Sequence, residues 1–111
     1  MVAGFLPHFR AVTGMLICTA TICAAAADAD NAVVKAGKKL AAEAKCEACH
    51  ISKVGGDGSA IYTRKDRRVS NRSKLLPQVA RCNSELSLGL FPEDEAAIAA
   101  YLNAAHYKFK D

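Results

Sequence analysis

A five-residue motif near the middle of the chain, Cys46-Glu47-Ala48-Cys49-His50, constrains this sequence more than any other feature. Two cysteines that are separated by two residues and followed at once by histidine form the attachment signal for a c-type haem. The spacing has a mechanical reason: the thiols add to vinyl groups on adjacent pyrroles, which brings the histidine under the iron. The motif predicts one covalent haem c, bound through Cys46 and Cys49, with His50 as the proximal iron ligand.

Two other uses of paired cysteines fit this sequence less well. A thioredoxin-like dithiol occurs near a βαβ pattern, and no alternating strand pattern of useful length is present. A zinc site needs further cysteine or histidine ligands at suitable spacing, and the candidates, Cys82 and His106, lie far along the chain. The haem interpretation therefore remains the main hypothesis.

The first 27 residues have the order of a secretory signal. Arg10 precedes an uncharged run that ends in the small residues 24–27, and Asp28 begins a polar sequence. A membrane anchor is the alternative, but residues 11–27 fall short of the roughly 20 apolar residues that span a bilayer and include threonine and small residues. We expect residues 1–27 to be a cleaved signal peptide and residues 28–111 to form one domain in the periplasm.

Cleavage would change the composition in ways that bear on the haem. Both methionines, Met1 and Met15, precede residue 28, so the mature chain would contain none. Cleavage would remove one of the 15 basic residues and none of the 11 acidic ones, so the domain stays cationic. A domain this small has little core of its own and often needs a cofactor to supply apolar surface.

Three segments have helical patterns. Residues 31–45 place apolar side chains at three- and four-residue spacing, and Gly37 in that pattern suggests close packing against another element. Residues 73–86 are expected to bury Cys82 with Leu75, Leu76, Val79 and Leu86. Residues 91–105 begin with a proline and three acidic residues, as helix N-termini favour. Ala97, Ile98, Tyr101 and Leu102 would form the buried face of this last helix.

Residues 51–69 look irregular, with a turn at the glycines of residues 55–58. A basic stretch follows, composed of Arg64, Lys65, Arg67, Arg68, Arg72 and Lys74. Such a run is most often a solvated face. It would also suit a docking surface for an acidic partner or cover for haem propionates. Nucleic acid is not an expected partner for an exported domain of modest charge.

The pattern around the motif resembles class I cytochrome c over most of residues 31–105. The residues that match are Gly37 and Leu40 before the motif, and Ile98, Tyr101 and Leu102 in the last helix. The resemblance implies an all-α domain of three to four helices wrapped around one covalent haem, with the first and last helices crossing near Gly37 and Tyr101. Two features of that family are missing: a proline whose carbonyl orients the proximal histidine, and a methionine before the last helix.

The sixth iron position therefore has other candidates, and Cys82 is the tentative distal ligand. The segment Arg81-Cys82-Asn83 somewhat resembles the small oxygen-binding Sphaeroides haem proteins. In that group the residue before such a cysteine reaches the iron and the cysteine is disulfide-bonded. Here that residue is Arg81, a poor ligand, and Leu90 stands about where the partner cysteine would be. His106, Asn83 and an empty position remain as alternatives, and an inert buried Cys82 is the simplest one.

These features predict a periplasmic c-type cytochrome that transfers single electrons to or from a redox partner with an acidic docking surface. The alternative is a haem protein that binds a diatomic gas, or processes a small sulfur or redox compound, beside Cys82. A third possibility is a subunit whose haem works beside a larger enzyme chain. No separate catalytic set is apparent, and no stable membrane insertion is expected after signal cleavage.

Overall fold

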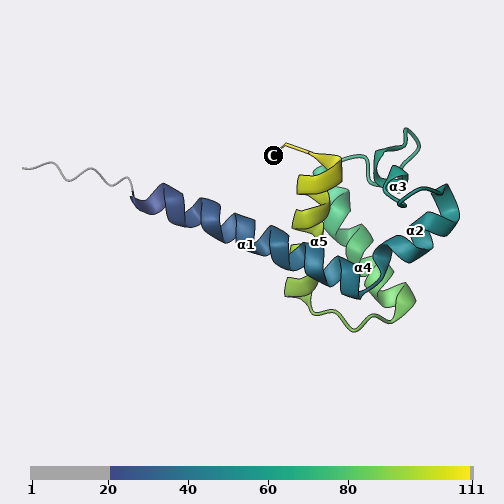
Figure 1. Ribbon diagram of the computed structural model, residues 1–111, viewed down its shortest axis with the longest axis horizontal. Helices are drawn as coiled ribbons and strands as arrows, with labels where there is room; N and C mark the ends of the chain where they lie inside the picture. The colour runs from purple at the N-terminus through teal and green to yellow at the C-terminus, as the bar shows by residue number, and fades with distance from the viewer. Residues whose placement is uncertain (1–20, 111) are drawn as a thin grey trace, which may run out of the picture.

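The computed structural model describes the backbone of residues 21–110 and the side chains of residues 29–110. This part of the chain contains helices and turns but no strand, which confirms the predicted all-α class (Figure 1). The α-helices are α1 (Thr21–Glu43), α2 (Cys46–Val54), α3 (Ala60–Thr63), α4 (Leu75–Leu86) and α5 (Pro92–Leu102). A 3₁₀ turn, η1 (Arg72–Lys74), precedes α4, and a π turn, η2 (Asn103–Tyr107), follows α5.

Helix α1 is longer than the sequence pattern predicts. It begins at Thr21, upstream of the expected start at residue 31, and ends at Glu43. Its N-terminal turns project beyond the other helices (Figure 1). Residues 1–20 of the predicted signal peptide lie outside the described residues, and α1 runs through the predicted cleavage site after Ala27, whose cleavage stays a prediction. In the part of the chain that the structure describes, we find no helix long and apolar enough to cross a membrane.

Helices α1 and α5 pack directly against each other, and α4 packs on α5. Gly37 is buried where α1 meets α5, and a Cβ atom at this position would overlap the backbone carbonyl of Ala97. Only a residue without a side chain allows this approach. The expected close packing at Gly37 is therefore confirmed, although Tyr101 is only half-buried.

The prediction that residues 51–69 are irregular is wrong in part. The helix that starts at the cysteine motif continues to Val54, and α3 adds a further turn, so five α-helices replace the expected three to four. Helix α2 ends at Gly55, whose φ of 74° lies in the left-handed region that favours glycine. The turn expected at residues 55–58 is confirmed by positive φ values at Gly55, Gly56 and Gly58.

The second predicted helix is largely confirmed, but its inward face differs. Asn71 caps the segment: its side chain accepts a hydrogen bond from the Lys74 amide at 3.3 Å. Leu75 and Val79 are buried as expected. Leu76 and Leu86 differ from the prediction: they are 45% and 54% exposed, and Leu86 lines the cavity described below. Cys82 is half-buried on that side.

The last helix also follows its prediction closely. Pro92 occupies the first position of α5, and the carboxylate of Asp94 accepts a hydrogen bond from the Phe91 amide at 3.0 Å. The chain then widens into the π turn η2, and the Asn103 side chain bonds the Phe109 backbone at 2.9 and 3.2 Å. These bonds fold the C-terminal tail back against the domain.

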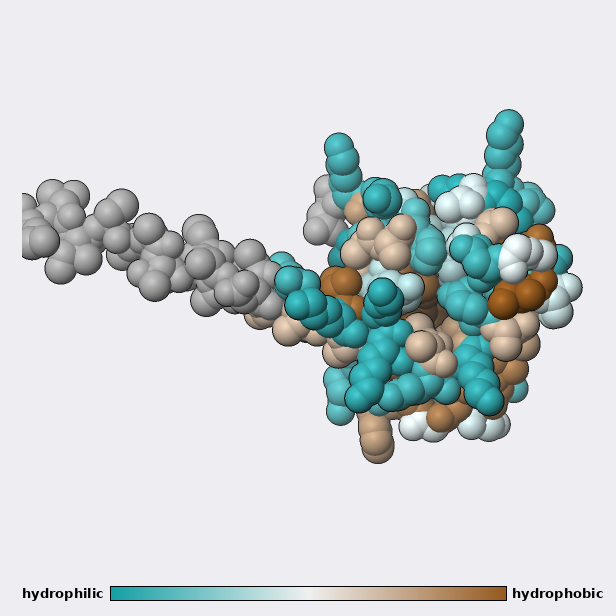
Figure 2. Space-filling model, viewed as in Figure 1, coloured by the Kyte–Doolittle hydropathy of each residue, from teal (hydrophilic) through white to brown (hydrophobic). Residues whose placement is uncertain are grey.

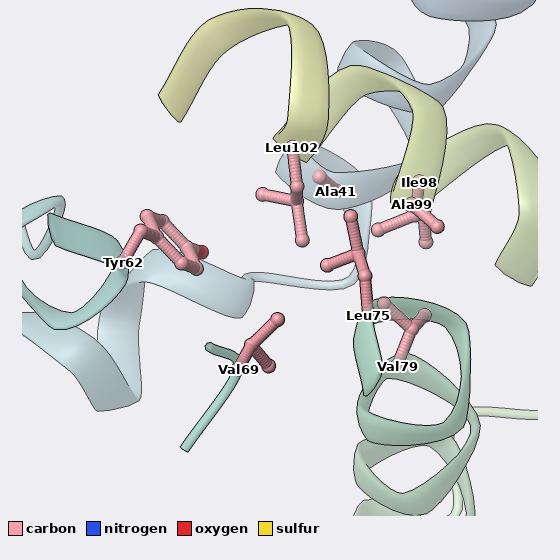
Figure 3. Close-up of a cluster of buried hydrophobic side chains, with 8 residues drawn as sticks. All are labelled: Ala41, Tyr62, Val69, Leu75, Val79, Ile98, Ala99 and Leu102. Atoms are coloured by element: carbon pink, nitrogen blue, oxygen red, sulfur yellow. The ribbon is translucent and has the colours of Figure 1, made fainter. Parts of the chain in front are cut away.

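The hydrophobic core has an open centre. The buried cluster comprises Ala41, Tyr62, Val69, Leu75, Val79, Ile98, Ala99 and Leu102. In Figure 3, Tyr62 and Val69 stand across a space from Leu75 and Leu102. On the face shown in Figure 2, hydrophilic side chains predominate, interrupted by smaller hydrophobic patches. Space at the centre of a core is unusual because protein interiors are packed as densely as organic crystals.

Candidate functional site: a cavity beside the Cys46–His50 helix

The three motif side chains belong to the first turns of α2. Lys45, in the left-handed conformation with φ of 53°, turns the chain sharply between α1 and α2. Positions three and four apart lie on the same face of a helix, so Cys46, Cys49 and His50 point to one side. Cys46 and His50 are half-buried, Cys49 is exposed, and both cysteines are free thiols.

All three side chains line the same cavity, of about 450 Å³. Its other walls include most of the buried cluster: Tyr62, Val69, Leu75, Val79, Ile98 and Leu102. Exposed residues such as Cys49 and Leu86 also line it, so the cavity opens to solvent. Its size lies within the ~300–1,000 Å³ range of ligand and cofactor pockets.

His50 is held by a side chain that the sequence analysis did not select. The Tyr62 hydroxyl lies 3.0 Å from His50 Nδ1 and donates its proton to Glu47 Oε1 at 2.9 Å. Since a hydroxyl has one proton to donate, its oxygen is left to accept a hydrogen bond from Nδ1–H. This arrangement leaves the lone pair of His50 on Nε2, the other ring nitrogen.

Glu47 brings a negative charge to the same place. Its Oε2 atom lies 3.5 Å from His50 Nδ1 and is buried without a hydrogen-bond partner among the described residues. Burial and the neighbouring Glu47 carboxylate raise the pKa of the Tyr62 hydroxyl, which therefore stays protonated. Burial also raises the pKa of the Cys46 thiol.

The glycine turn brings Tyr62 to His50. Gly58 has a φ of 83°, and a Cβ atom at this position would lie 2.9 Å from the His50 Cβ. The turn thus folds flat against α2 and returns the chain so that Tyr62, on α3, faces the motif. The glycine run signalled this turn in the sequence, but no local pattern selects Tyr62, 12 residues from His50.

The structure separates the candidates for the sixth ligand. Cys82 lines the cavity, and Gln78 Nε2 donates a hydrogen bond to its Sγ at 3.4 Å. The Asn83 amide is engaged elsewhere: it bonds Leu90 O, Leu90 N and Glu95 Oε1 at 2.9, 3.1 and 2.7 Å. His106 stacks on the Tyr62 ring with centroids 4.7 Å apart. Of these three, Cys82 alone shares the cavity wall with His50.

Several cations surround the cavity. Lys53, Arg64, Arg68 and Arg81 line it, so the basic stretch contributes two residues to its wall. The Arg81 guanidinium also binds Glu85 at 2.7 Å, an interaction that raises the pKa of Arg81. Arg67 serves the fold instead, since it bonds Val69 O at 3.1 Å and lies over the Phe109 ring.

Within the described residues, no three side chains of His, Cys, Asp or Glu converge to form a metal site of their own. Comparison with models of known families, with curated proteins and with solved structures finds no match to the chain. The function is therefore argued from the residues and the cavity.

Proposed function

We propose that this protein is a periplasmic monohaem c-type cytochrome that transfers single electrons. The observation that carries the proposal is the cavity at the centre of the core, onto which Cys46, Cys49 and His50 all open. An apolar hollow in so small a domain is costly unless something fills it. The Cys46–His50 motif on its wall predicts that haem c fills it.

The residues around the cavity fit haem c. The apolar wall suits the macrocycle, which supplies its own four nitrogen ligands, so the protein need provide only axial ones. The buried Glu47 oxygen without a hydrogen-bond partner is a negative charge that a cationic centre beyond His50 would balance. Arginines on the wall suit the propionate carboxylates, because guanidinium pairs well with carboxylate.

Cys46 and Cys49 would hold the haem through thioether bonds, and His50 would bind the iron through Nε2. When bound, the haem supplies a one-electron redox couple. The chain's own part is to anchor the group covalently, to orient His50 through the Nδ1 hydrogen bond, and to exclude water with the core residues.

The proposal is tested with protein exported in a host that attaches haem c. We expect a pyridine haemochrome spectrum and a mass increased by one haem, both lost in the Cys46→Ala/Cys49→Ala variant. Cys82→Ala is the matched control, because Cys82 lines the same cavity but lies outside the motif, and it should keep the covalent haem. A wild-type chain that stays haem-free under these conditions would refute the proposal.

A second function is favoured by the position of Cys82. If its sulfur binds the iron as a thiolate, the potential is lowered, which suits sulfur or redox chemistry. If the sulfur does not bind, no methionine replaces it in the mature chain, and the open position admits a diatomic gas. Cys82 with its Gln78 hydrogen bond makes thiolate ligation our first choice.

Optical spectra with and without CO distinguish these cases. Low-spin spectra that ignore CO support an electron carrier, whereas a high-spin ferrous state that binds CO supports a ligand-binding protein. In Cys82→Ser, a thiolate ligand predicts an altered ferric spectrum, while Ser84→Ala, an exposed change on the same helix, should leave it intact. An unchanged ferric spectrum in Cys82→Ser would remove Cys82 as the ligand.

The basic stretch supports a redox partner with an acidic docking surface. Arg64 and Arg68 lie at the cavity, so a negatively charged partner attracted to them would come close to the bound group. Electron exchange requires such an approach rather than tight binding. Periplasmic localisation rests on the predicted signal peptide and is tested by finding the processed chain, without residues 1–27, in a periplasmic fraction.

A further inference from the structure

We propose that Tyr62 and Glu47 form a positioning pair that fixes the tautomer and ring orientation of His50 and makes its Nε2 atom a stronger electron donor. This inference rests on the proposed function, because a donor atom needs an iron to act on. It assigns a role to two residues that lie outside the attachment chemistry. Neither residue would touch the iron, so both act through His50.

The first argument is the direction of the hydrogen bonds. A carboxylate can only accept, so the Tyr62 proton goes to Glu47 Oε1 over 2.9 Å. The Tyr62 oxygen then accepts from His50 Nδ1 over 3.0 Å. The two bonds form a chain from the ring nitrogen to a negative charge.

The second argument is that Tyr62 cannot turn away. Its side chain is only 4% exposed. The ring stacks on His106 at an interplanar angle of 26° and meets Tyr107 edge-on with centroids 5.6 Å apart. Both contacts come from η2, so the end of the chain fixes the ring that orients His50. The His50 and Tyr62 rings are themselves nearly perpendicular, at 87°.

The third argument is the position of the Glu47 carboxylate. Glu47 Oε2 is buried, has no hydrogen-bond partner among the described residues, and lies 3.5 Å from the same ring nitrogen. The Glu47 side chain is 36% exposed as a whole, but its Oε2 atom is out of contact with solvent and faces the His50 ring.

The expected effect follows from the chemistry of metal-bound imidazole. A hydrogen bond from Nδ1–H to a carboxylate, backbone carbonyl or water fixes the tautomer and raises the basicity of the ligating nitrogen. A more basic ligand stabilises ferric over ferrous iron, which lowers the midpoint potential. In this chain the negative charge of Glu47 reaches the ring mainly through the Tyr62 hydroxyl.

The test compares Tyr62→Phe and Glu47→Gln in the haem-loaded protein. Each should raise the midpoint potential, by about 59 mV if the ferrous form gains tenfold in equilibrium. Each should also lower the iron–histidine stretching frequency of ferrous protein with an open sixth position. Tyr101→Phe is the control, since it also removes a tyrosine hydroxyl, but Tyr101 neither lines the cavity nor bonds His50 in the structure.

The double variant decides whether the two residues act as one chain. If Glu47 acts through Tyr62, adding Glu47→Gln to Tyr62→Phe should change the potential little further. If the two single shifts in potential add fully in the double variant, Glu47 acts on the ring directly as a charge and not through Tyr62. That result would overturn the pairing. Unchanged potentials and stretching frequencies in both single variants would overturn the inference as a whole.

Failure of this inference and failure of the proposed function are distinguishable. If the wild-type chain carries haem and the variants match it, only the positioning role fails. If the wild-type chain carries no haem, the proposed function fails. The pairing is then decided by ¹⁵N NMR of His50 in the haem-free chain. It is supported if the wild type holds the Nδ1–H tautomer and Tyr62→Phe changes it. It is contradicted if the wild type holds the Nε2–H tautomer.

Discussion

At the scale of single residues, Gly37 and His50 depend on atoms far from them in the sequence. Gly37 sets how closely α1 approaches α5, because the carbonyl of Ala97 occupies the place where its side chain would be. His50 depends on a tyrosine hydroxyl on α3 and on a carboxylate one turn before it. Gly37 thus acts through its contact with Ala97, and His50 is oriented through its contact with Tyr62.

Gly37→Ala should destabilise the domain. The new methyl group must push α1 and α5 apart, and overpacking of this kind costs about 1–3 kcal/mol, offset by at most ~1 kcal/mol of improved helix propensity. Chemical denaturation of the haem-loaded protein measures the change. Lys38→Ala, at an exposed neighbouring position, is the control and should stay within about 0.5 kcal/mol of wild type. Equal or greater stability in Gly37→Ala would contradict the close approach.

At the scale of elements, one asparagine joins α4 to α5. The Asn83 amide holds both backbone groups of Leu90 and the Glu95 carboxylate, so it fixes the connection between the two helices. The connection also includes Ser87, in the left-handed conformation at φ 52°. These hydrogen bonds tie the connecting loop to both helices.

Asn83→Ala should cost about 2–3 kcal/mol of unfolding free energy, because it leaves half-buried backbone groups of Leu90 unpaired. The haem spectrum should change much less than the stability, since the Asn83 side chain does not line the cavity. Ser84→Ala, exposed on the same helix, is the comparison. A large spectral change with normal stability would instead return Asn83 to the sixth-ligand candidates.

The sequence predicted the elements that local chemistry decides. The proline at the start of α5 and the glycine turn each carry their meaning within a few residues. It failed where distant contacts decide. Residues 51–54 continue α2 because no residue before Gly55 stops the helix. Leu76 fits the apolar pattern of its helix but is 45% exposed, because the placement of neighbouring elements, not the pattern, decides burial. Tyr62 was missed because only the closed turn brings it to His50.

At the scale of the whole molecule, the hollow core sets the stability. The cavity of about 450 Å³ leaves the apolar residues on its wall without packing partners, and the whole stability of a small domain is only about 5–15 kcal/mol. The filled and empty chains should therefore differ in their state of folding.

The Cys46→Ala/Cys49→Ala variant should behave as a molten globule. We expect helical far-ultraviolet circular dichroism, loss of the near-ultraviolet signal, and binding of the dye ANS to exposed apolar surface. Haem-loaded Cys82→Ala should show none of these changes. A haem-free variant that unfolds cooperatively and does not bind the dye would show that the core closes without the group.

The cationic surface makes a further prediction at this scale. Reduction of anionic ferricyanide by the ferrous protein should slow as salt rises, because ions screen attraction beyond about 8–10 Å at 0.1–0.15 M. Stopped-flow mixing measures the rate. Lys65→Glu, in the basic stretch, should weaken the salt dependence more than Lys38→Glu on α1. Equal effects would show that net charge, and not this stretch, governs the encounter.

The walls of the cavity have a consequence for the order of assembly. Cys46 and Cys49 are made well before Leu102 and Tyr107, which close part of the wall from the last two helical segments. While those segments are still undocked, the thiols face an open side through which a flat group can enter. If the thiols bind haem as we propose, the final helix would dock over it afterwards. Because the chain is made from its N-terminus, the thiols would be available before the closing wall, in the order that this assembly requires.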